Sequence, residues 1–437
     1  MTATTVDRSY VLPLAFATSV SMWAVAYFCR LPVVMAPSWL VLGLMLGMVA
    51  LWGWFAGARA GGGWLGGMLV GGVAAVLNLL ILGSLLAPAE GGGMIPSAVW
   101  WVPGSILIVA LVSGGFAGAS RRAGSEATPS DWTALFSKVA VAATFLLVVA
   151  GGLVTSNEAG LAVVDWPNSF GSNMFLFPLA RMTGGIYYEH AHRLFGALVG
   201  LTTIALAVRL WRYDDRAWLK RLSLAAVVLV VLQGILGGLR VTGGLTLSTS
   251  EADMAPSIAL AVMHGVLGQL FLGLIVAIAV VTSSWWLRAP EAEARPNVNG
   301  DRTLQFWLVA TLVVQLVLGA VQRHLAQGLI IHITLAAVVV MLAVVAGVRA
   351  WGLYHGTWPV QRLGQALIGL ASVQVTLGIA ALAVTQGKAV VGSPTTVEVT
   401  IATAHQATGA ALLALAVTLH LWMRRLFRQE DVKTSEG

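Results

Sequence analysis

A cluster of ionisable residues stands in the segment YYEHAHRLFG (187–196), at the start of a long apolar run. Ionisable side chains near the hydrocarbon region of a membrane are costly unless another group compensates them, so they indicate function. Glu189 lies three residues before His192 and shares a helix face with it. There a carboxylate could orient the ring, relay protons or stabilise a cation developing on a substrate. The alternative is a solvated carboxylate at a helix N-terminus.

Four histidines recur at equivalent positions, in the segments HRLFG, HGVLG, HITLA and HQATG. They are His192, His264, His332 and His405. Each has Gly or Ala one helical turn later, which leaves room for a flat group against the helix. Because Cys29 is the only cysteine, these imidazoles favour b-type haem, gripped by a histidine from each of two helices. Zinc or copper is the alternative, but no tight histidine cluster supports it.

Other polar residues near these helix ends have weaker assignments. His190 lies about 200° around a helix from His192, so we expect it to be a bystander. His324, in RHLAQG, either touches a haem edge or caps a turn. Arginine can pair with a carboxylate through two hydrogen bonds, which suits it as a partner of a haem propionate. Three arginines are candidates for this role: Arg193, Arg240 and Arg323. For each of them the alternative is an interfacial arginine that reaches lipid headgroups.

These residues need a membrane scaffold. The chain of 437 residues is 58% hydrophobic and only 10% charged, whereas soluble proteins carry roughly 25% charged residues. Blocks of about 20 apolar residues span a bilayer as helices. We therefore predict an all-α polytopic membrane protein with twelve transmembrane helices. The spans are expected at residues 9–29, 38–57, 64–87, 97–119, 135–154, 189–210, 222–242, 258–284, 304–322, 329–350, 364–384 and 399–423.

The last eight spans repeat as helix pairs. The first members of three pairs carry QGILG (233–237), QLVLG (315–319) and QVTLG (374–378), and the second members of all four carry the recurring histidines. The span at 135–154 has AGGLVTS, a weaker version of the same unit. This internal repeat predicts an eight-helix core made of two pseudo-symmetric four-helix bundles.

The basic residues predict the orientation. One set of loops, together with both tails, holds 19 of the 25 Lys and Arg residues, so we expect that side and both termini to be cytoplasmic. The other side holds Arg30, Arg181, Arg193, Arg240, Arg323 and Lys388. The histidines then lie toward the outer face. The net charge of +7 therefore reflects membrane orientation and does not indicate nucleic-acid binding.

A polar segment (120–138) separates the first four spans from the other eight. We predict an N-terminal block (1–125) and a core (135–425) with halves at 135–284 and 302–425. The block has no histidine, and its many glycines indicate close helix packing. Its role is open; if the core is autonomous, a chain without residues 1–125 should stay active. The long outer loop (155–188) is expected to form a structured lid.

The segment GGLVTSNEAGLAVVDWPNSFG, followed by EHAHRLFGALVG, resembles the haem A synthase family. The resemblance covers about residues 137–425 and includes the DWP loop, the E-x-x-H-R motif and a histidine in each second helix. It implies a membrane oxidoreductase that converts haem O into haem A for cytochrome oxidase biogenesis. In that reaction the C8 methyl group is oxidised to a formyl group.

The resemblance also implies residue roles. His192 and His264 would flank the substrate haem, His332 and His405 would ligate a resident haem b, and Glu189 matches the family's essential glutamate. The implied partners are haem O and the haem O synthase that supplies it. The electron donor and a homo-oligomeric state stay open. The implied location is a bacterial-type inner membrane.

Some bacterial members of the family carry a cysteine pair in the first outer loop of the core, and this chain does not. It therefore resembles the cysteine-free branch. One alternative is a bis-His dihaem b-type cytochrome, which would not need Glu189. Another is a transporter, although the polar residues gather at the outer ends of the helices. Glu189 has no counterpart beside the other three histidines, where Ala261, Leu329 and Ala402 stand. This asymmetry predicts chemistry in the first half.

Overall fold

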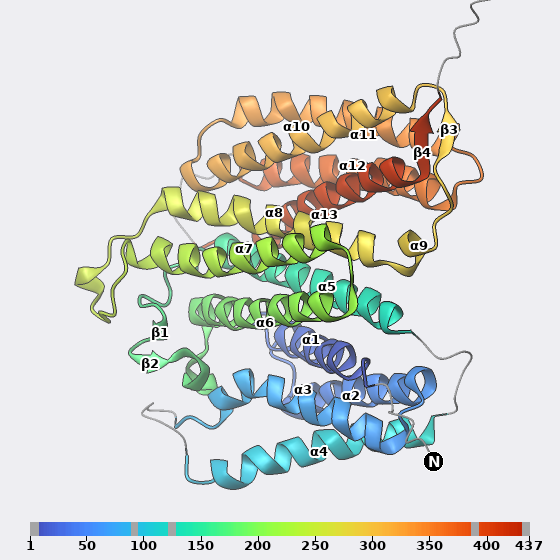
Figure 1. Cartoon of the computed structure of the whole chain (residues 1–437). Helices are drawn as coiled ribbons and strands as arrows, with labels where there is room; N and C mark the ends of the chain where they lie inside the picture. Colours follow the sequence, from blue (N-terminus) through green and yellow to red (C-terminus); the bar gives the residue numbers. More distant parts are fainter. Residues whose placement is uncertain (1–7, 89–94, 121–127, 386–392, 431–437) are drawn as a thin grey trace, which may run out of the picture. The chain divides into compact units, whose positions relative to one another are not determined.

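The computed structural model describes residues 8–88, 95–120, 128–385 and 393–430, most of which are helical (Figure 1). Twelve of the described helices are long and apolar enough to cross a membrane, which confirms the predicted number of spans and the all-α class. The largest differences are at helix starts. Thus α5 begins at Pro129 rather than at residue 135, because Thr128 and Asp131 form a capping box around a polar first turn. Hydropathy does not detect such a turn.

The chain divides into two compact units, Met1–Pro256 and Ser257–Gly437. The boundary falls between the seventh and eighth spans, so the predicted half 135–284 is shared between the units. The domain bounds 1–125, 135–284 and 302–425 stay predictions. Residues Arg121, Arg122 and Lys388, which entered the count of basic residues, lie outside the described residues.

The first unit begins with α1 (Val11–Cys29), α2 (Ser38–Ala60), α3 (Gly63–Leu85) and α4 (Ala98–Ala119). Glycines let α2 and α3 approach α4 closely. A Cβ atom on Gly53 would lie 2.4 Å from the carbonyl oxygen of Ser113, and one on Gly71 would lie 2.6 Å from that of Val109. These contacts confirm that glycine serves helix packing in this block.

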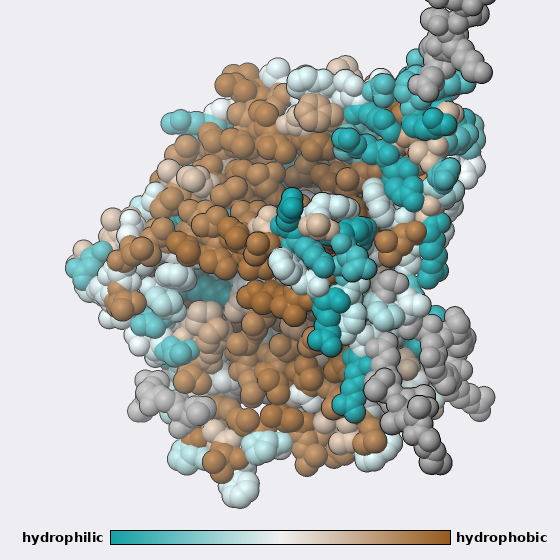
Figure 2. Space-filling model, in the orientation of Figure 1, coloured by the Kyte–Doolittle hydropathy of each residue, from teal (hydrophilic) through white to brown (hydrophobic). Residues whose placement is uncertain are grey.

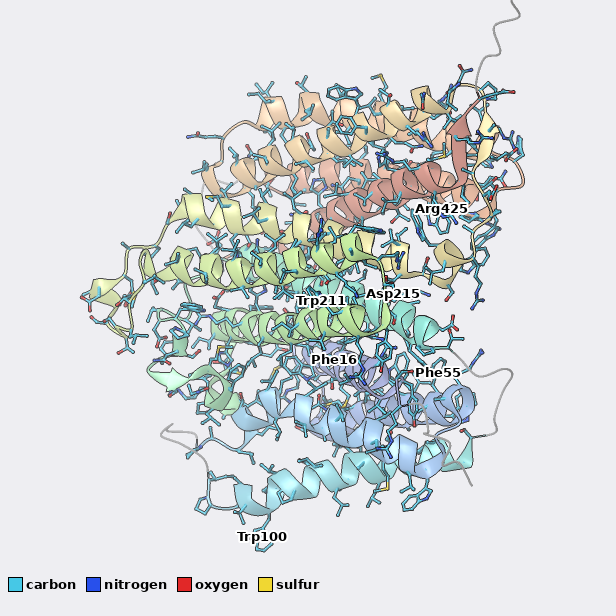
Figure 3. The ribbon with its side chains drawn as sticks, viewed as in Figure 1. Phe16, Phe55, Trp100, Trp211, Asp215 and Arg425 are labelled. Carbon is cyan, nitrogen blue, oxygen red and sulfur yellow. The ribbon has the colours of Figure 1, made fainter. Side chains whose placement is uncertain are left out.

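The same unit continues with α5 (Pro129–Ser156), α6 (Gly184–Tyr213) and α7 (Ala217–Thr242). In both the contacts and the view of Figure 1, α1 lies beside α5 and α6. The ring of Phe16, labelled in Figure 3, packs against that of Phe136 with centroids 5.2 Å apart. Near the C-terminal end of α6, Arg209 donates hydrogen bonds to the carbonyl oxygen of Ser9 (2.5 Å) and to the hydroxyl of Thr133 (2.9 Å). The N-terminal block is therefore packed onto α5 and α6 through α1 and the residues just before it.

The loop between α5 and α6 is structured, as predicted. It contains β1 (Asn168–Ser169) and β2 (Ser172–Asn173), paired antiparallel, and the short 3-10 helices η1 (Met174–Leu176) and η2 (Leu179–Arg181). A further 3-10 helix, η3 (Glu251–Asp253), follows α7. We call residues 157–183 the lid loop. Its side chains meet α3, α6 and α7, as detailed below.

The second unit contains α8 (Ile258–Thr282), α9 (Ser284–Leu287), α10 (Val298–Leu325), α11 (Leu329–Leu353), α12 (Trp358–Thr385) and α13 (Thr396–Leu426). Helices α10 to α13 each contact the next, and α13 contacts α10, so they form the closed four-helix bundle that the repeat predicted. Helix α8 packs against α10 and α13. Strands β3 (Glu293–Arg295) and β4 (Phe427–Gln429) pair in parallel. Buried Asp301 accepts hydrogen bonds from Arg349 and Tyr354, both at 2.5 Å, which ties α10 to α11.

Apolar side chains cover the outward surfaces of the helices, and hydrophilic ones gather at helix ends and loops (Figure 2). Trp100 on α4 points outward and is 78% exposed (Figure 3), and Ile330 on α11 is 80% exposed. Large apolar groups in such positions need a lipid environment. Both units therefore present the surface of a multi-pass membrane protein.

Candidate functional site

Glu189 lies inside α6 and not at its end. The helix begins at Gly184, whose φ of +53° suits glycine, so Glu189 stands in the second turn. Glu189 as a whole residue is 4% exposed, and its carboxylate pairs with Arg193 one turn later, with Nε and Oε1 3.1 Å apart. The other oxygen, Oε2, has no hydrogen-bond partner among the described residues. The alternative of a solvated carboxylate at the helix N-terminus is therefore wrong.

Arg193 connects α6 to the lid loop. Besides its bond to Glu189, its guanidinium donates hydrogen bonds to the carbonyl oxygens of Asp165 (2.7 Å), Asn168 (3.1 Å) and Val163 (2.9 Å). Most of its donors are thus engaged within the chain. The prediction that Arg193 binds a propionate is untested, but the structure gives it a clear second role in holding the loop over Glu189.

His190 is not the bystander we expected. It is completely buried, its Nδ1 lies 3.1 Å from the hydroxyl of Ser169, and its ring packs on Phe177 with centroids 4.9 Å apart. It points away from the His192 face, as predicted, but toward the lid loop. The helical periodicity was right, and the expectation of no role was wrong because the loop folds back onto that face.

Asp165 and Trp166 of the DWP motif organise the lid loop further. The Asp165 carboxylate accepts the backbone N–H groups of Phe170 (2.7 Å) and Gly171 (2.8 Å), which closes the turn between β1 and β2. The Trp166 ring lies against Gly238 of α7, where a Cβ atom would approach it to 2.3 Å. The motif was recognised from the sequence, but these contacts were not predicted.

Arg240 joins the same cluster from α7. Its guanidinium donates a hydrogen bond to the carbonyl oxygen of Gly160 (2.9 Å) in the lid loop. Its charge interacts with those of Glu189 and Arg193, and both arginines interact with His192. The first unit therefore brings together four of the predicted site residues beneath the lid loop: Glu189, His192, Arg193 and Arg240.

His192 occupies a groove made by glycine. A Cβ atom on Gly151 of α5 would lie 3.0 Å from Cε1 of the His192 ring, so a larger residue there would push the ring aside. The ring also makes a hydrogen bond with the backbone of Leu147. In this helix pair, Gly151 in the repeated segment of α5 thus makes room for His192 of α6.

The second unit repeats this arrangement twice. A Cβ atom on Gly319 would lie 3.2 Å from Cε1 of His332, and one on Gly378 would lie 3.1 Å from Cε1 of His405. These are the glycines of the QxxLG segments. The glutamines of the same segments contact the rings: Gln315 Nε2 lies 3.0 Å from His332 Nδ1, and Gln374 Nε2 lies 3.4 Å from His405 Nε2. The repeat was visible in the sequence, but the sequence did not predict that its glycines and glutamines contact the histidine rings.

His332 and His405 come together in the second unit. They stand on α11 and α13, and a charge on His332 affects His405. No three His, Cys, Asp or Glu side chains gather as a metal-ion site among the residues that the structure describes. The charges of the two imidazoles are thus close enough to interact, and their role as a pair of haem ligands stays a prediction.

For the remaining predicted residues, the structure gives a position on a helix, which does not by itself bear on haem binding. His264 is half-buried on α8, in the second unit, while its predicted partner His192 is in the first, so this pairing stays a prediction. Arg323 and His324 lie in the last turn of α10, exposed and half-buried respectively. Their haem contacts also stay predictions.

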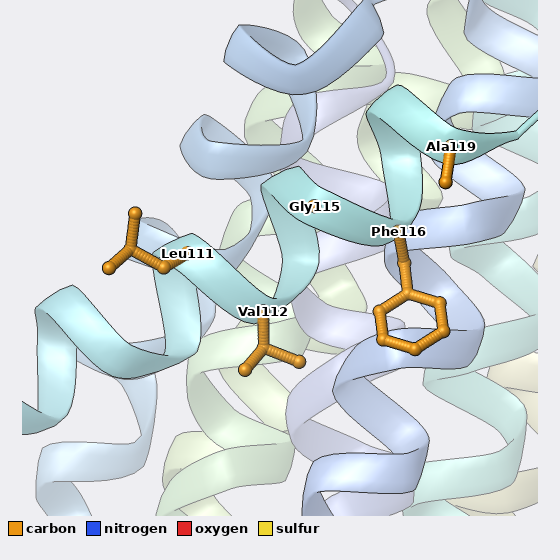
Figure 4. A pocket seen from close by; sticks show the side chains of 5 residues that line it. All are labelled: Leu111, Val112, Gly115, Phe116 and Ala119. Atoms are coloured by element: carbon orange, nitrogen blue, oxygen red, sulfur yellow. The ribbon is translucent and has the colours of Figure 1, made fainter.

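A shallow apolar hollow on α4 is lined by Leu111, Val112, Gly115, Phe116 and Ala119 (Figure 4). None of these residues can ionise or bind a metal, so we assign no chemistry to this hollow.

Comparison with known proteins finds similarity over the part of the chain that carries these first-unit residues. Residues 134–333 match the model of a family described as cytochrome oxidase assembly protein. The chain is 24% identical over 193 residues to a haem A synthase of Alkalihalophilus pseudofirmus, which covers 44% of this chain and 59% of that protein. It is 28% identical over 214 residues to a haem A synthase of Rhodopseudomonas palustris, which covers 42% of this chain and 54% of that protein.

A third relative is a protoheme IX farnesyltransferase of Haloarcula marismortui, 29% identical over 153 residues, or 35% of this chain and 30% of that protein. The chain thus spans somewhat more than half the length of the two haem A synthases that it matches. The family match includes the lid loop, the buried Glu189–Arg193 pair and three of the four recurring histidines.

Proposed function

We propose that this chain, in which residues 134–333 match a family of cytochrome oxidase assembly proteins, is a haem A synthase. It would act as a membrane oxidoreductase on haem O, oxidising the C8 methyl group to a formyl group for cytochrome oxidase biogenesis. The observation that carries this proposal is the buried pair of Glu189 and Arg193 beside His192, under a lid loop fixed to three helices. A protein that only carries electrons has no need of such a carboxylate.

Glu189 is the proposed catalytic residue. Its Oε1 is held by Arg193, while Oε2 is buried without a hydrogen-bond partner among the described residues. Such a carboxylate can take up a proton at Oε2 or stabilise positive charge that develops on the substrate. Arg193 would hold the carboxylate in its present orientation through the bond to Oε1. The lid loop would exclude water while the methyl group reacts.

His192 and His264 are the proposed ligands on either side of the substrate haem. Gly151 gives the His192 ring its place against α5. The position of Arg240 next to Glu189 and His192 supports it as a partner for a propionate, because its remaining donors can face a carboxylate. Arg323 and Arg193 are proposed for the same task, and His324 as a neighbour of a haem edge.

His332 and His405 are proposed to hold a resident haem b in the second unit. The residues fit this group, because His332 on α11 is close enough to His405 on α13 for their charges to interact, and the buried Nδ1 of His405 has no hydrogen-bond partner among the described residues. Two histidines from two helices are the usual donors to b-type haem in helical bundles. When bound there, haem b would supply one-electron transfer.

The protein is a multi-pass membrane protein, and we propose that it lies in a bacterial-type inner membrane with both termini cytoplasmic. The distribution of basic residues supports this orientation. The lid loop and the histidines would then lie toward the outer face. Haem O synthase is the proposed supplier of substrate, and similarity to a protoheme IX farnesyltransferase is in keeping with a neighbouring step.

The deciding experiment is haem extraction after co-expression with a source of haem O. We expect haem A, or its hydroxylated intermediate, in chromatography of the extracted haems. Extracts that contain only haem b and unmodified haem O would favour the bis-His dihaem cytochrome instead. An inactive Glu189→Gln variant produced at the same level serves as the matched control for background conversion.

A further inference from the structure

Helix α1 contacts α6 directly beside the proposed catalytic residue. The Tyr187 hydroxyl donates a buried hydrogen bond to the carbonyl oxygen of Tyr27 at 2.7 Å. The rings of the two tyrosines are stacked, with centroids 5.7 Å apart and planes 10° from parallel. Tyr187 stands two residues before Glu189, so this contact fixes the turn that carries the carboxylate.

A second contact lies on the other side of the same segment. Phe195, two residues after Arg193, receives the rings of Trp23 and Tyr27 edge-on, with centroids 5.7 and 5.3 Å away. Trp23 is itself held by α3, because its indole N–H donates a hydrogen bond to Asn78 Oδ1 at 3.1 Å. The contacts of α1 thus bracket the segment from Tyr187 to Phe195.

Helix α3 contacts the lid loop. A Cβ atom on Gly83 would lie 2.4 Å from the carbonyl oxygen of Phe175, and the Ser84 hydroxyl lies 3.5 Å from the same oxygen. Phe175 belongs to η1, and Phe177 just after it packs on His190 of α6. Helices α1 and α3 therefore reach both parts of the first-unit site, namely the α6 segment and the lid loop.

We propose that the N-terminal four-helix block is a positioning module for this site, with Tyr187 as a positioning residue for Glu189. Helix α1 sets the place of the α6 segment, and α3 sets the place of the lid loop against it. The inference rests on the proposed function for what Glu189 does, but the positioning itself can be measured separately. It predicts that the core is not autonomous, so a chain without residues 1–125 should lose activity.

The lid loop is long, so it needs contacts on more than one side to stay in place. An irregular segment of this kind has little buried core of its own and opens locally more easily than the helices that it joins. Contacts on α6 and α7 hold it from one side. Contacts with α3 hold it from the other, which limits movement of the loop relative to Glu189. Displacements of about 1 Å in an active site can lower rates by roughly a hundredfold.

The first test removes only the hydroxyl of Tyr187. In Tyr187→Phe the stacked ring stays and the bond to Tyr27 is lost, so local opening between α1 and α6 should become roughly fivefold more frequent. Cys29, the single cysteine, stands two residues after Tyr27 and is half-buried. Its rate of labelling by a maleimide in the full-length membrane protein reports this opening. Tyr213→Phe, which removes an exposed hydroxyl at the far end of α6, is the matched control.

The second test moves the lid loop from the side of α3. Gly83→Ala places a methyl group against the Phe175 carbonyl, whereas Gly72→Ala on the same helix meets nothing within 4 Å. We expect haem A formation to fall about tenfold in Gly83→Ala and to stay unchanged in Gly72→Ala. The resident haem of the second unit should absorb normally in both, which separates positioning from general misfolding.

The two readouts distinguish the inference from the proposed function. If wild-type protein forms no haem A, the proposed function fails, and the Cys29 labelling rates still test the contact between α1 and α6. If Tyr187→Phe labels at the wild-type rate and Gly83→Ala converts haem O as fast as Gly72→Ala does, the positioning module is disproved. Faster labelling of Cys29 in Tyr187→Phe with an unchanged rate of haem O conversion would also overturn the inference, since the contact between Tyr187 and Tyr27 would then be structural only.

Discussion

Glu189 and Arg193 form a buried ion pair on successive turns of α6, with Nε and Oε1 3.1 Å apart. Their side chains are only 5% and 8% exposed, and the remaining donors of Arg193 hold three carbonyl groups of the lid loop. One charged residue thus links the proposed catalytic carboxylate to the segment that covers it. Two of the five predictions below concern this pair, two concern the paired histidines of the second unit, and one concerns an ion pair outside the membrane.

Replacement of Glu189 by Gln should lower the formation of haem A by about 10²- to 10⁴-fold, because the amide keeps the shape but cannot take up a proton. The resident haem should be retained. Chromatography of extracted haems measures the loss, and absorption spectra measure the retained haem. Glu158→Gln, an exposed position just after α5, is the matched control. Unchanged haem A in Glu189→Gln would reduce Glu189 to a structural partner of Arg193.

Replacement of Arg193 by Ala should lower the free energy of unfolding by about 3–5 kcal/mol, because a buried carboxylate loses its partner. In a Glu189→Gln background the same change should cost less, since no buried charge is then left unpaired. Thermal unfolding in detergent measures both. Arg212→Ala, at an exposed position on the same helix, should have a small effect. Equal losses in the two backgrounds would show that Arg193 acts through the loop alone.

Replacement of His332 or His405 by Ala should abolish the resident haem b, because each is proposed as one of its two ligands. The reduced-minus-oxidised absorption spectrum of the purified protein measures this directly. His355→Ala, at an exposed position after α11, is the control and should leave the spectrum unchanged. A full b-type spectrum in both ligand variants would refute the assignment.

Replacement of Gly319 or Gly378 by Ala should weaken haem binding in the second unit. The added methyl group would lie 3.2 Å from the His332 ring or 3.1 Å from the His405 ring, so each ring must turn from its present position. Haem content per protein should fall, and the reduction potential of the residual haem should shift. Gly369→Ala on α12 meets nothing within 4 Å and serves as the control. Equal haem content in all three variants would show that the glycines are not needed.

Asp214 gives a pH dependence outside the membrane. Partial burial disfavours its charge, but two hydrogen bonds from Arg216, at 2.9 and 2.6 Å, and the charge of Arg216 outweigh this and lower the pKa of Asp214. Its stabilising contribution is therefore present above the unfolded value of about 4 and is lost as the pH falls through the lower folded pKa.

The pair is partly exposed, so screening keeps this contribution below about 1 kcal/mol. The difference in unfolding temperature between wild type and Asp214→Asn should accordingly shrink as the pH is lowered from 6 to about 3. Asp215→Asn, in the same turn, is the control. A difference that does not change with pH would mean that the ion pair contributes nothing to stability.

Much of the scaffold could be predicted from the sequence. The twelve spans follow from apolar runs, because a helix in lipid satisfies its own backbone hydrogen bonds and needs only an apolar surface. The recurring histidines and QxxLG segments follow from the internal repeat. The starts of α5 and α6 were placed too late, because their first turns are polar or glycine-rich and are set by local capping.

The sequence by itself therefore determined the membrane class, the number of spans, and Glu189 and the recurring histidines as site candidates. Only the tertiary structure decided that Arg193 spans from Glu189 to the lid loop, that His190 holds this loop, and that Tyr187 meets Tyr27, 160 residues earlier in the chain. The reason is physical. Hydropathy and periodicity are properties of a short stretch of chain, whereas the partners of a buried polar group come from whichever distant segments fold against it.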